Sequence, residues 1–378
     1  MSWRADFDLR DDVVWLNSAH QSALPRRAAE AAAEAVRWKL QPWELTTARF
    51  QSVPAALRRA LGAIAGVPAD EVILTSGASF GLHALANSLP LERGDEVLVL
   101  RGDFPSNILP WRLAERAGVV VRPLEPARPV LSPDEVRDAI GPATRVVCLS
   151  WVHSFSGHAH DLDAIGAICR ERGVWFVVNA TQGMGLRPFD ADAQPIDAVV
   201  CSGWKGLCGP YGTGFAWFRP ALLDRMIGRQ AYWLTMQTAD DLARTADPEL
   251  PARFGPRQYE IFGTANFFNF VPFEVSASYV GGIGAACVCD ALGGLVDRFI
   301  AGLDRGRYDL VSPAEGPSRS TLVVFSHRDP ARNEPLHRRL LDAGIWTAAR
   351  QGRLRISPHV YNTADEIDRT LAVLGAAE

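Results

Sequence analysis

The residue of this sequence best suited to covalent chemistry is a lysine in a glycine-rich turn. Only Lys39 and Lys205 are lysines among the 39 lysine and arginine residues, and Lys205 lies in the segment CSGWKGLCGPYGTG. The remaining positive charges are arginines, a bias that we attribute to genomic base composition and that makes a retained lysine informative. A lysine in such a turn can hold a cofactor as a Schiff base, and a surface lysine is the alternative interpretation.

Two other polar turns follow apolar runs and would complete a cofactor site. The segment TSGAS, from Thr75 to Ser79, offers backbone N–H groups, a hydroxyl and a helix N-terminus, which together suit a phosphate. A capped helix without a ligand is the alternative there. Asn179 follows the run VWFVV and precedes Lys205 by 26 residues, one strand–loop–strand step, so both are expected to face one crevice. The combination indicates a cofactor bound as a Schiff base.

Short, nearly continuous apolar runs alternate with helical patterns along most of the chain. Such runs predict a mostly parallel sheet with helices on both faces. From about Val280, a long helix and a strand–helix–strand–strand–helix succession predict a smaller α+β domain. We expect an N-terminal arm at 1–16, a large domain at 17–275 and a small domain at 276–378. The expected strands of the large sheet are residues 72–74, 96–100, 119–121, 146–149, 174–178, 198–201 and 215–218, and the expected helices are 26–40, 54–64, 81–89 and 161–172.

The composition is that of an ordinary soluble enzyme. The 378 residues are 48% hydrophobic and 22% charged, which is enough for one large domain and a smaller one. A formal net charge of −4 argues against nucleic acid or an anionic membrane and favours a small molecule or a second copy as partner. No signal peptide or membrane span is evident, so we expect a cytoplasmic protein. Six cysteines without a CxxC pair predict buried free thiols rather than disulfides or zinc.

Nearly the whole chain, from VVWLNSA to RLRISPHVYNTADEID, resembles the class V aminotransferase family of pyridoxal-phosphate enzymes. That family includes cysteine desulfurases, kynureninases, C–S lyases and isopenicillin N epimerase-like proteins. The resemblance implies fold type I, with a large mostly parallel-sheet domain and a small C-terminal α+β domain. It also implies an amino-acid substrate and a homodimer with shared active sites. Lys205 would form the Schiff base and move the proton at the substrate Cα.

By the same resemblance, a set of residues would hold the pyridoxal 5'-phosphate. Phe104 would stack on the pyridine ring, although a core phenylalanine is the alternative, and Gln182 would approach the phenolic oxygen. Gly263 and Thr264 would reach the phosphate of the partner subunit. The full set is Gly77, Ala78, Ser79, Phe104, Ser154, Asn179, Gln182, Ser202, Trp204, Lys205, Gly263 and Thr264.

The substrate side would be formed by three residues from the two ends of the chain. Arg355 would bind the α-carboxylate through its bidentate guanidinium, and pairing with Asp365 or Glu366 is the alternative. Asn17 and His20 would line the same side. His153 is placed near the expected cofactor, where its near-neutral pKa suits acid–base catalysis.

Some positions depart from the family pattern. Asn179 stands where the family has an aspartate, which raises the pKa of the pyridine nitrogen by about 1–3 units. Its loss would weaken the electron sink by about 1.4 to 4 kcal/mol. Trp204 replaces a histidine, Ser154 replaces an asparagine, and WTAARQGRLR, ahead of Arg355, lacks the nucleophilic cysteine of desulfurases. Persulfide transfer is therefore disfavoured and elimination is favoured.

The sequence accordingly predicts a lyase and leaves alternatives open. We expect β-elimination on a cysteine conjugate in secondary metabolism, giving a thiol, pyruvate and ammonia. An isopenicillin N epimerase-like racemase or a decarboxylating deaminase is the alternative, and an aminotransferase is less favoured. A catalytically silent protein that binds pyridoxal phosphate or a metal is the alternative from another class. We expect no metal site, because the spacing in the tract from His153 to Asp161 matches no helical i, i+4 pair and Asp161 suits a helix start.

Overall fold

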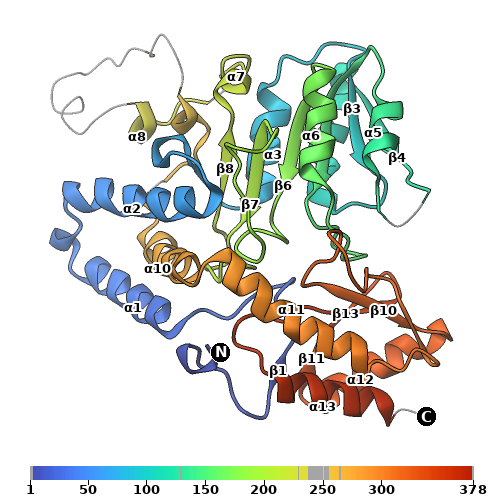
Figure 1. Ribbon diagram of the computed structural model, residues 1–378. Coiled ribbons are helices and arrows are strands. Elements are labelled where there is room, and N and C mark those ends of the chain that lie inside the picture. The colour runs from blue at the N-terminus through green and yellow to red at the C-terminus, as the bar shows by residue number, and fades with distance from the viewer. Residues whose placement is uncertain are drawn as a thin grey trace.

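A seven-stranded sheet forms the centre of the larger part of the molecule in the computed structural model (Figure 1). The structure describes residues 3–127, 130–228, 230–236, 250, 255–263 and 265–376. The strand order is β2-β8-β7-β6-β5-β3-β4, and β8 alone runs antiparallel to its neighbours in this sheet. The predicted mostly parallel sheet is therefore confirmed. Its strands are β2 (Ile73–Thr75), β3 (Glu96–Leu100), β4 (Val120–Leu124), β5 (Thr144–Ser150), β6 (Trp175–Asn179), β7 (Ala198–Ser202) and β8 (Gly214–Phe218).

Both faces of this sheet are buried, which explains why its strands are apolar without alternation. In β3, Val97 and Val99 enter one core together with Leu82 of α3. Leu98, the residue between them, enters the other core together with Leu61 of α2. The helices are α1 (Arg26–Leu40), α2 (Thr47–Ala65), α3 (Ala78–Ser88), α4 (Leu109–Ala114), α5 (Pro133–Ala139), α6 (Leu162–Glu171), α7 (Pro220–Leu223), α8 (Trp233–Met236), α10 (Phe267–Ile283), α11 (Ala285–Gly302), α12 (Asn333–Asp342) and α13 (Ala364–Gly375).

Helix α1 has the predicted bounds, whereas α2 begins earlier than expected. The sequence suggested a start at Pro54, but α2 begins at Thr47 and Pro54 lies inside it. Proline in a helix interior loses one backbone hydrogen bond, and here burial of Leu57 and Leu61 against the sheet offsets that loss. Helix α10 likewise contains a proline and was not predicted as a separate helix.

The C-terminal part contains a four-stranded antiparallel sheet, so the predicted small α+β unit is present. Its strand order is β12-β13-β10-β9, and β9 was not predicted. A short parallel pair, β1 with β11, joins the N-terminal arm to this part. The predicted boundary at 275/276 falls within α10 and remains a prediction. The strands are β1 (Val14–Trp15), β9 (Tyr308–Leu310), β10 (Val323–His327), β11 (Ile345–Trp346), β12 (Ala348–Arg350) and β13 (Arg353–Ile356).

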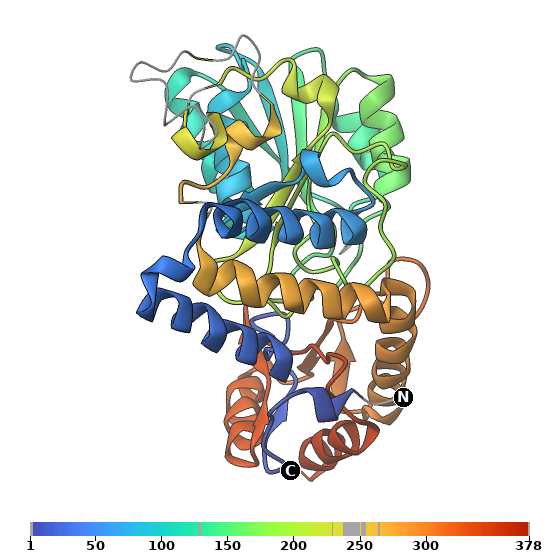
Figure 2. The same cartoon turned by 90° about the vertical axis from the view of Figure 1, so that its left-hand side faces the viewer.

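Helices α1, α2 and α10 pack side by side along one side of the molecule (Figure 2). Within the described ranges, no single helix is long and apolar enough to cross a membrane. Helices α10 and α11 meet that test only as a pair and by length and composition, and they are bent by 77°. The bend lies at Gly284, whose φ of 86° is a conformation that favours glycine.

Candidate active site

A cavity of about 340 Å³ lies at the carboxyl ends of β6 and β7 and is closed by the hairpin β12–β13. It brings together most of the side chains that the sequence singled out. The predicted residues that line it are His20, Ala78, Ser79, Phe104, Ser154, Asn179, Gln182, Ser202, Trp204, Lys205 and Arg355. The lining residues that the sequence did not indicate are Ala19, Ser106, Ser150, Phe155, Thr181, Tyr211 and Arg350.

One end of the cavity is the N-terminus of α3. The N-cap residue, Gly77, has no side chain to cap the helix, and the Ala78 N–H donates instead to Ser202 Oγ at 3.1 Å. Gly77 has φ 143°, and an added Cβ would lie 2.9 Å from a ring carbon of Trp204. Ser79 adds a hydroxyl that is hydrogen-bonded to Ser106 Oγ at 2.8 Å. A helix N-terminus with the hydroxyls of Ser79 and Ser202 beside it and no room for a larger residue at position 77 suits a phosphate.

Lys205 follows β7, and its amine reaches the middle of the cavity. Burial, reinforced by the positive charge of Arg355, lowers the pKa of Lys205 from 10.5 to about 7. Much of the amine is therefore neutral at neutral pH, as a nucleophile or base requires. Its Nζ lies 5.3 Å from the centroid of the Phe104 ring, and that ring is 37% exposed. Phe155 stacks on the Phe104 ring with 6.3 Å between the ring centroids, and the role predicted for Phe104 toward the cofactor remains a prediction.

Asn179, at the end of β6, belongs to a buried hydrogen-bond network. Its Nδ2 donates to Asn107 Oδ1 at 2.7 Å, and its Oδ1 accepts from the Thr181 N–H at 3.1 Å. Asn107 Nδ2 in turn donates to Asp103 Oδ2 and to Ser150 Oγ, both at 2.8 Å. Asp103 also accepts from the Ser150 N–H at 2.9 Å and from Ser150 Oγ at 2.6 Å.

This network fixes which atom of Asn179 is available to the cavity. The Asp103 carboxylate accepts only, so the amide nitrogen of Asn107 must face it and the Asn107 oxygen must face Asn179. The backbone N–H of Thr181 fixes the Asn179 oxygen in the same way. One N–H of Asn179 is left for a group in the cavity. The wall therefore offers a neutral donor where the family pattern has a carboxylate.

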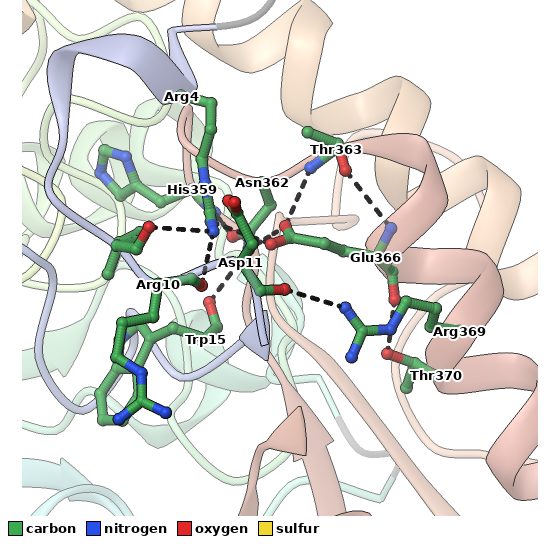
Figure 3. Close-up of polar contacts among 11 residues, drawn as sticks. Arg4, Arg10, Asp11, Trp15, His359, Asn362, Thr363, Glu366, Arg369 and Thr370 are labelled. Atoms are coloured by element: carbon green, nitrogen blue, oxygen red, sulfur yellow. Dashed lines mark hydrogen bonds and ion pairs between the residues drawn. The ribbon is translucent and has the colours of Figure 1, made fainter. Parts of the chain in front are cut away.

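Arg355, on β13, brings a guanidinium to the cavity lining. It is 4% exposed, and its Nη1 donates to the Ser154 carbonyl at 3.1 Å. In the described part of the chain its Nε has no hydrogen-bond partner and no carboxylate pairs with it. Glu366, one of the predicted alternatives, pairs instead with Arg4 at 2.9 Å (Figure 3). A buried guanidinium with unused donors suits an anionic ligand.

The comparison with protein families agrees with this geometry. The family model "Aminotransferase class-V" matches residues 14–370. The chain belongs to this family. A probable cysteine desulfurase of Pseudomonas aeruginosa is 29% identical over 98% of the chain and 96% of its own length. A probable cysteine desulfurase of Xylella fastidiosa is 30% identical over 84% of the chain and 79% of its own length. An isopenicillin N epimerase of Amycolatopsis lactamdurans is 25% identical over 98% of the chain and 96% of its own length.

Solved structures with low sequence identity share the fold of this class V family member. A C-DES variant with glycine covalently linked to its pyridoxal-phosphate cofactor has a TM-score of 0.89 at 20% identity, covering 100% of both chains. The complex of a cystine C–S lyase with cysteine persulfide has a TM-score of 0.88 at 21% identity, covering 97% and 98%. The predicted family, fold type and pyridoxal-phosphate cofactor are confirmed. The predicted enzyme class, a pyridoxal-phosphate-dependent lyase of this family, is also confirmed.

Pyridoxal phosphate fits the residues of the cavity. The α3 N-terminus with its neighbouring hydroxyls suits the phosphate, Phe104 offers an aromatic ring in the cavity lining, and Lys205 offers an amine of lowered pKa. Trp204 takes the histidine position and packs against Tyr211 with 4.5 Å between ring centroids. Gln182 Nε2 donates to the Ala19 carbonyl at 3.0 Å and to Ser154 Oγ at 3.3 Å. The predicted roles of these side chains toward the cofactor remain predictions.

Among the described residues, four predicted ones are absent from the cavity lining: Gly77, His153, Asn17 and Gly263. His153 bonds through both ring nitrogens, to Ser156 Oγ at 2.9 Å and to the Gly102 carbonyl at 3.2 Å, and its role in acid–base catalysis remains a prediction. Asn17 is buried behind the wall. Gly263 has a φ of 76° with open space around it, and Thr264 lies outside the described residues. Among the described residues there is no group of three metal ligands, the histidine tract included.

The missed residues lay within or beside motifs that the sequence did mark. Thr181 and Tyr211 belong to the two turns around Asn179 and Lys205, and Asn107 follows Phe104 in the same segment. Of the missed residues, Arg350 could have been inferred from the sequence, because it precedes a turn and the alternation of side chains along strands places it on the same face as Arg355.

Proposed function

We propose that this enzyme catalyses β-elimination on a cysteine conjugate in secondary metabolism, as a C–S lyase. The observation that carries the proposal is the network behind Asn179, which offers the cofactor ring a neutral N–H donor. A pyridine nitrogen without an anionic partner is less basic by about 1–3 pKa units and stores charge less well. Elimination needs less stored charge than transamination, because the leaving group departs with the electrons.

In this reaction, Arg355 and Lys205 have different roles. When bound, pyridoxal phosphate supplies an electron-withdrawing ring that makes the substrate Cα–H acidic. Arg355 binds the α-carboxylate and thereby orients the Cα–H bond. Lys205, with its pKa near 7, accepts the Cα proton, and the C–S electron pair leaves with sulfur. In balance, one cysteine conjugate and one water give a thiol, pyruvate and an ammonium ion.

Persulfide transfer, which a desulfurase requires, lacks a nucleophile in this cavity. No cysteine is among its described lining residues. Four cysteines are buried elsewhere, and burial raises the thiol pKa of Cys148 and Cys208 to about 12. Cys287 and Cys289 lie on α11. This supports elimination of the whole sulfur substituent rather than transfer of one sulfur atom.

Racemisation is the second candidate, because two relatives are isopenicillin N epimerases that match almost the whole chain. It would exchange the Cα proton without releasing sulfur. We also propose a homodimer in which the segment at Gly263 and Thr264 completes the partner's phosphate site. Ser79 at that site is exposed in the single chain, which leaves room for such a segment. Sedimentation of the holoenzyme tests the dimer.

The two lysines of the chain provide a matched test of the cofactor site. The protein is incubated with pyridoxal phosphate, reduced with borohydride and weighed by mass spectrometry. We expect a covalent adduct on the wild type and on Lys39→Ala, and none on Lys205→Ala. The capture rate should be half-maximal near pH 7, where the Lys205 amine becomes neutral. An unchanged adduct on Lys205→Ala would refute the site.

The reaction itself is tested with the loaded enzyme and S-substituted cysteines. We expect equal amounts of thiol and pyruvate, with no product from Lys205→Ala. Interconversion of the D and L forms without pyruvate would overturn elimination in favour of racemisation. Release of CO2 with an aldehyde would overturn both.

A further inference from the structure

The charge of the cavity exceeds what a simple amino acid would neutralise. Two arginines, Arg350 and Arg355, line it beside the largely neutral Lys205, and no aspartate or glutamate is among its described lining residues. The chain as a whole carries a net charge of −4, so this is a local concentration of positive charge. Cations that share one site repel each other and attract anions of matching number and spacing.

The hairpin β12–β13 places Arg350 and Arg355 on one of its two faces. Arg355 pairs with Ala348, and Arg353 pairs with Arg350. Opposite residues of an antiparallel pair point to the same face, as do residues two apart, so Arg350 and Arg355 share a face. The two-residue turn between the strands, Gln351-Gly352, has φ values of 51° and 72°, which suits a tight hairpin.

The two arginines occupy different depths of the cavity. Arg355 is 4% exposed and lies at the inner end, whereas Arg350 is exposed and lies toward solvent. In the described structure, the hydrogen bond found for the Arg350 side chain goes from Nη1 to the Ala349 carbonyl at 2.9 Å, and no carboxylate pairs with it. Its positive charge acts on Lys205, Arg355 and His20, because it is named among the causes that lower the pKa of each. Its fork of donors is thus available to a ligand in the cavity.

The anionic groups of the proposed reaction already have other partners. The cofactor phosphate matches the α3 N-terminus, and the substrate α-carboxylate matches Arg355. Arg350 is left without an anion. We propose that Arg350 binds a second acidic group on the substrate side chain, so that the preferred substrate is a cysteine conjugate whose sulfur substituent carries a carboxylate. This inference rests on the proposed function for the identity of the conjugate, but the anion site can be tested without any reaction.

Binding of unreactive acids to the holoenzyme tests the site directly. Calorimetry would compare glutarate and adipate with butyrate and hexanoate, which lack the second carboxylate. We expect the dicarboxylates to bind the wild type about tenfold more tightly, as one additional charged hydrogen-bonded pair allows. Arg350→Gln should remove that difference. Arg338→Gln, at an exposed arginine of α12 outside the cavity lining, should retain it.

The kinetic counterpart uses two conjugates that differ only in charge. With S-(2-carboxyethyl)cysteine, Arg350→Gln should raise KM about tenfold, and with S-propylcysteine the rise in KM should be several-fold smaller. Equal binding of mono- and dicarboxylates to the wild type would overturn the proposal. An Arg350→Gln protein that keeps the dicarboxylate preference but binds pyridoxal phosphate more weakly would also overturn the proposal, because Arg350 would then bind the cofactor phosphate. A dicarboxylate preference that Arg350→Gln removes, without pyruvate from any conjugate, would support the anion site and refute elimination instead.

Discussion

At the scale of single residues, the buried network behind Asn179 decides what the cavity wall can offer. Asp103 is 3% exposed and carries the negative charge, but Asn107 stands between it and the cavity. The Asp103 carboxylate fixes the orientation of the Asn107 amide, and Asn107 in turn fixes the orientation of the Asn179 amide. A fully satisfied buried network of this kind tolerates substitution poorly.

We expect Asn179→Asp to be destabilising, although it restores the family's usual residue. The new carboxylate oxygen would face Asn107 Oδ1, and two acceptors without a proton between them cost about 1–3 kcal/mol. Asn107 cannot turn round, because its oxygen would then face Asp103. The measurement is urea unfolding of the cofactor-free protein at two pH values. The loss should shrink at low pH, where the introduced carboxyl is protonated, and full wild-type stability at pH 8 would contradict the assigned orientations.

At the scale of elements, the turn between β12 and β13 holds both arginines of the cavity in register. Glycine and glutamine occupy its two positions, and both have positive φ. Because the connection has only these two residues, Arg350 and Arg353 lie directly opposite each other. Arg350 reaches the cavity because it is the last residue before this turn.

Gly352→Ala is expected to lower the free energy of unfolding by about 1–2 kcal/mol, because an L-residue is strained at a φ of 72°. No atom lies within 4 Å of the added Cβ, so the loss would come from backbone conformation and not from a clash. Gly141→Ala is the matched control, since its Cβ also meets open space and its φ is not in the left-handed region. Urea midpoints at unchanged m values give the comparison. Equal effects of the two substitutions would argue against a strained turn.

At the scale of the whole molecule, the two chain ends and the lysine turn form one packed unit. Figure 3 shows Arg4 of the N-terminal arm paired with Glu366 of α13, beside Asn362 and His359. His359 is fully buried, and its Nε2 donates to the carbonyl of Gly206 at 3.2 Å, next to Lys205. The segment after Arg355 therefore supports the turn that carries the reactive lysine.

Burial lowers the pKa of His359 from 6.5 to about 4, which makes stability depend on pH. Between these values the unfolded chain binds a proton that the folded protein does not, so stability is lost as pH falls from about 6.5 to about 4. The loss amounts to roughly 3 kcal/mol at 1.36 kcal/mol per unit. From pH 6.5 to pH 4, the free energy of unfolding of His359→Gln should therefore fall by about 3 kcal/mol less than that of the wild type. The free energy of unfolding of His83→Gln, at an exposed site on α3, should fall as much as that of the wild type.

The sequence by itself determined the strands of the large sheet and marked Lys205 and the turn from Thr75 to Ser79, whose roles toward the cofactor remain predictions. Each is a local pattern: a continuous apolar run has to be buried on both faces, and glycine is needed at position 77, where φ is 143° and an added Cβ would lie 2.9 Å from Trp204. The same local rules failed at α2, because Pro54 marked a plausible helix start while the energy that extends the helix comes from burial against the sheet.

Only the tertiary structure decided which polar groups meet. The Asn107–Asn179 contact joins residues 72 positions apart, and the Arg4–Glu366 pair joins residues 362 apart. The cavity likewise combines Lys205 from the large sheet with Arg350 and Arg355 from the C-terminal hairpin. No local pattern fixes such contacts, since their geometry depends on how two sheets and the chain ends pack together. Hydrogen-bond direction, and with it the polarity of the site, follows from that packing.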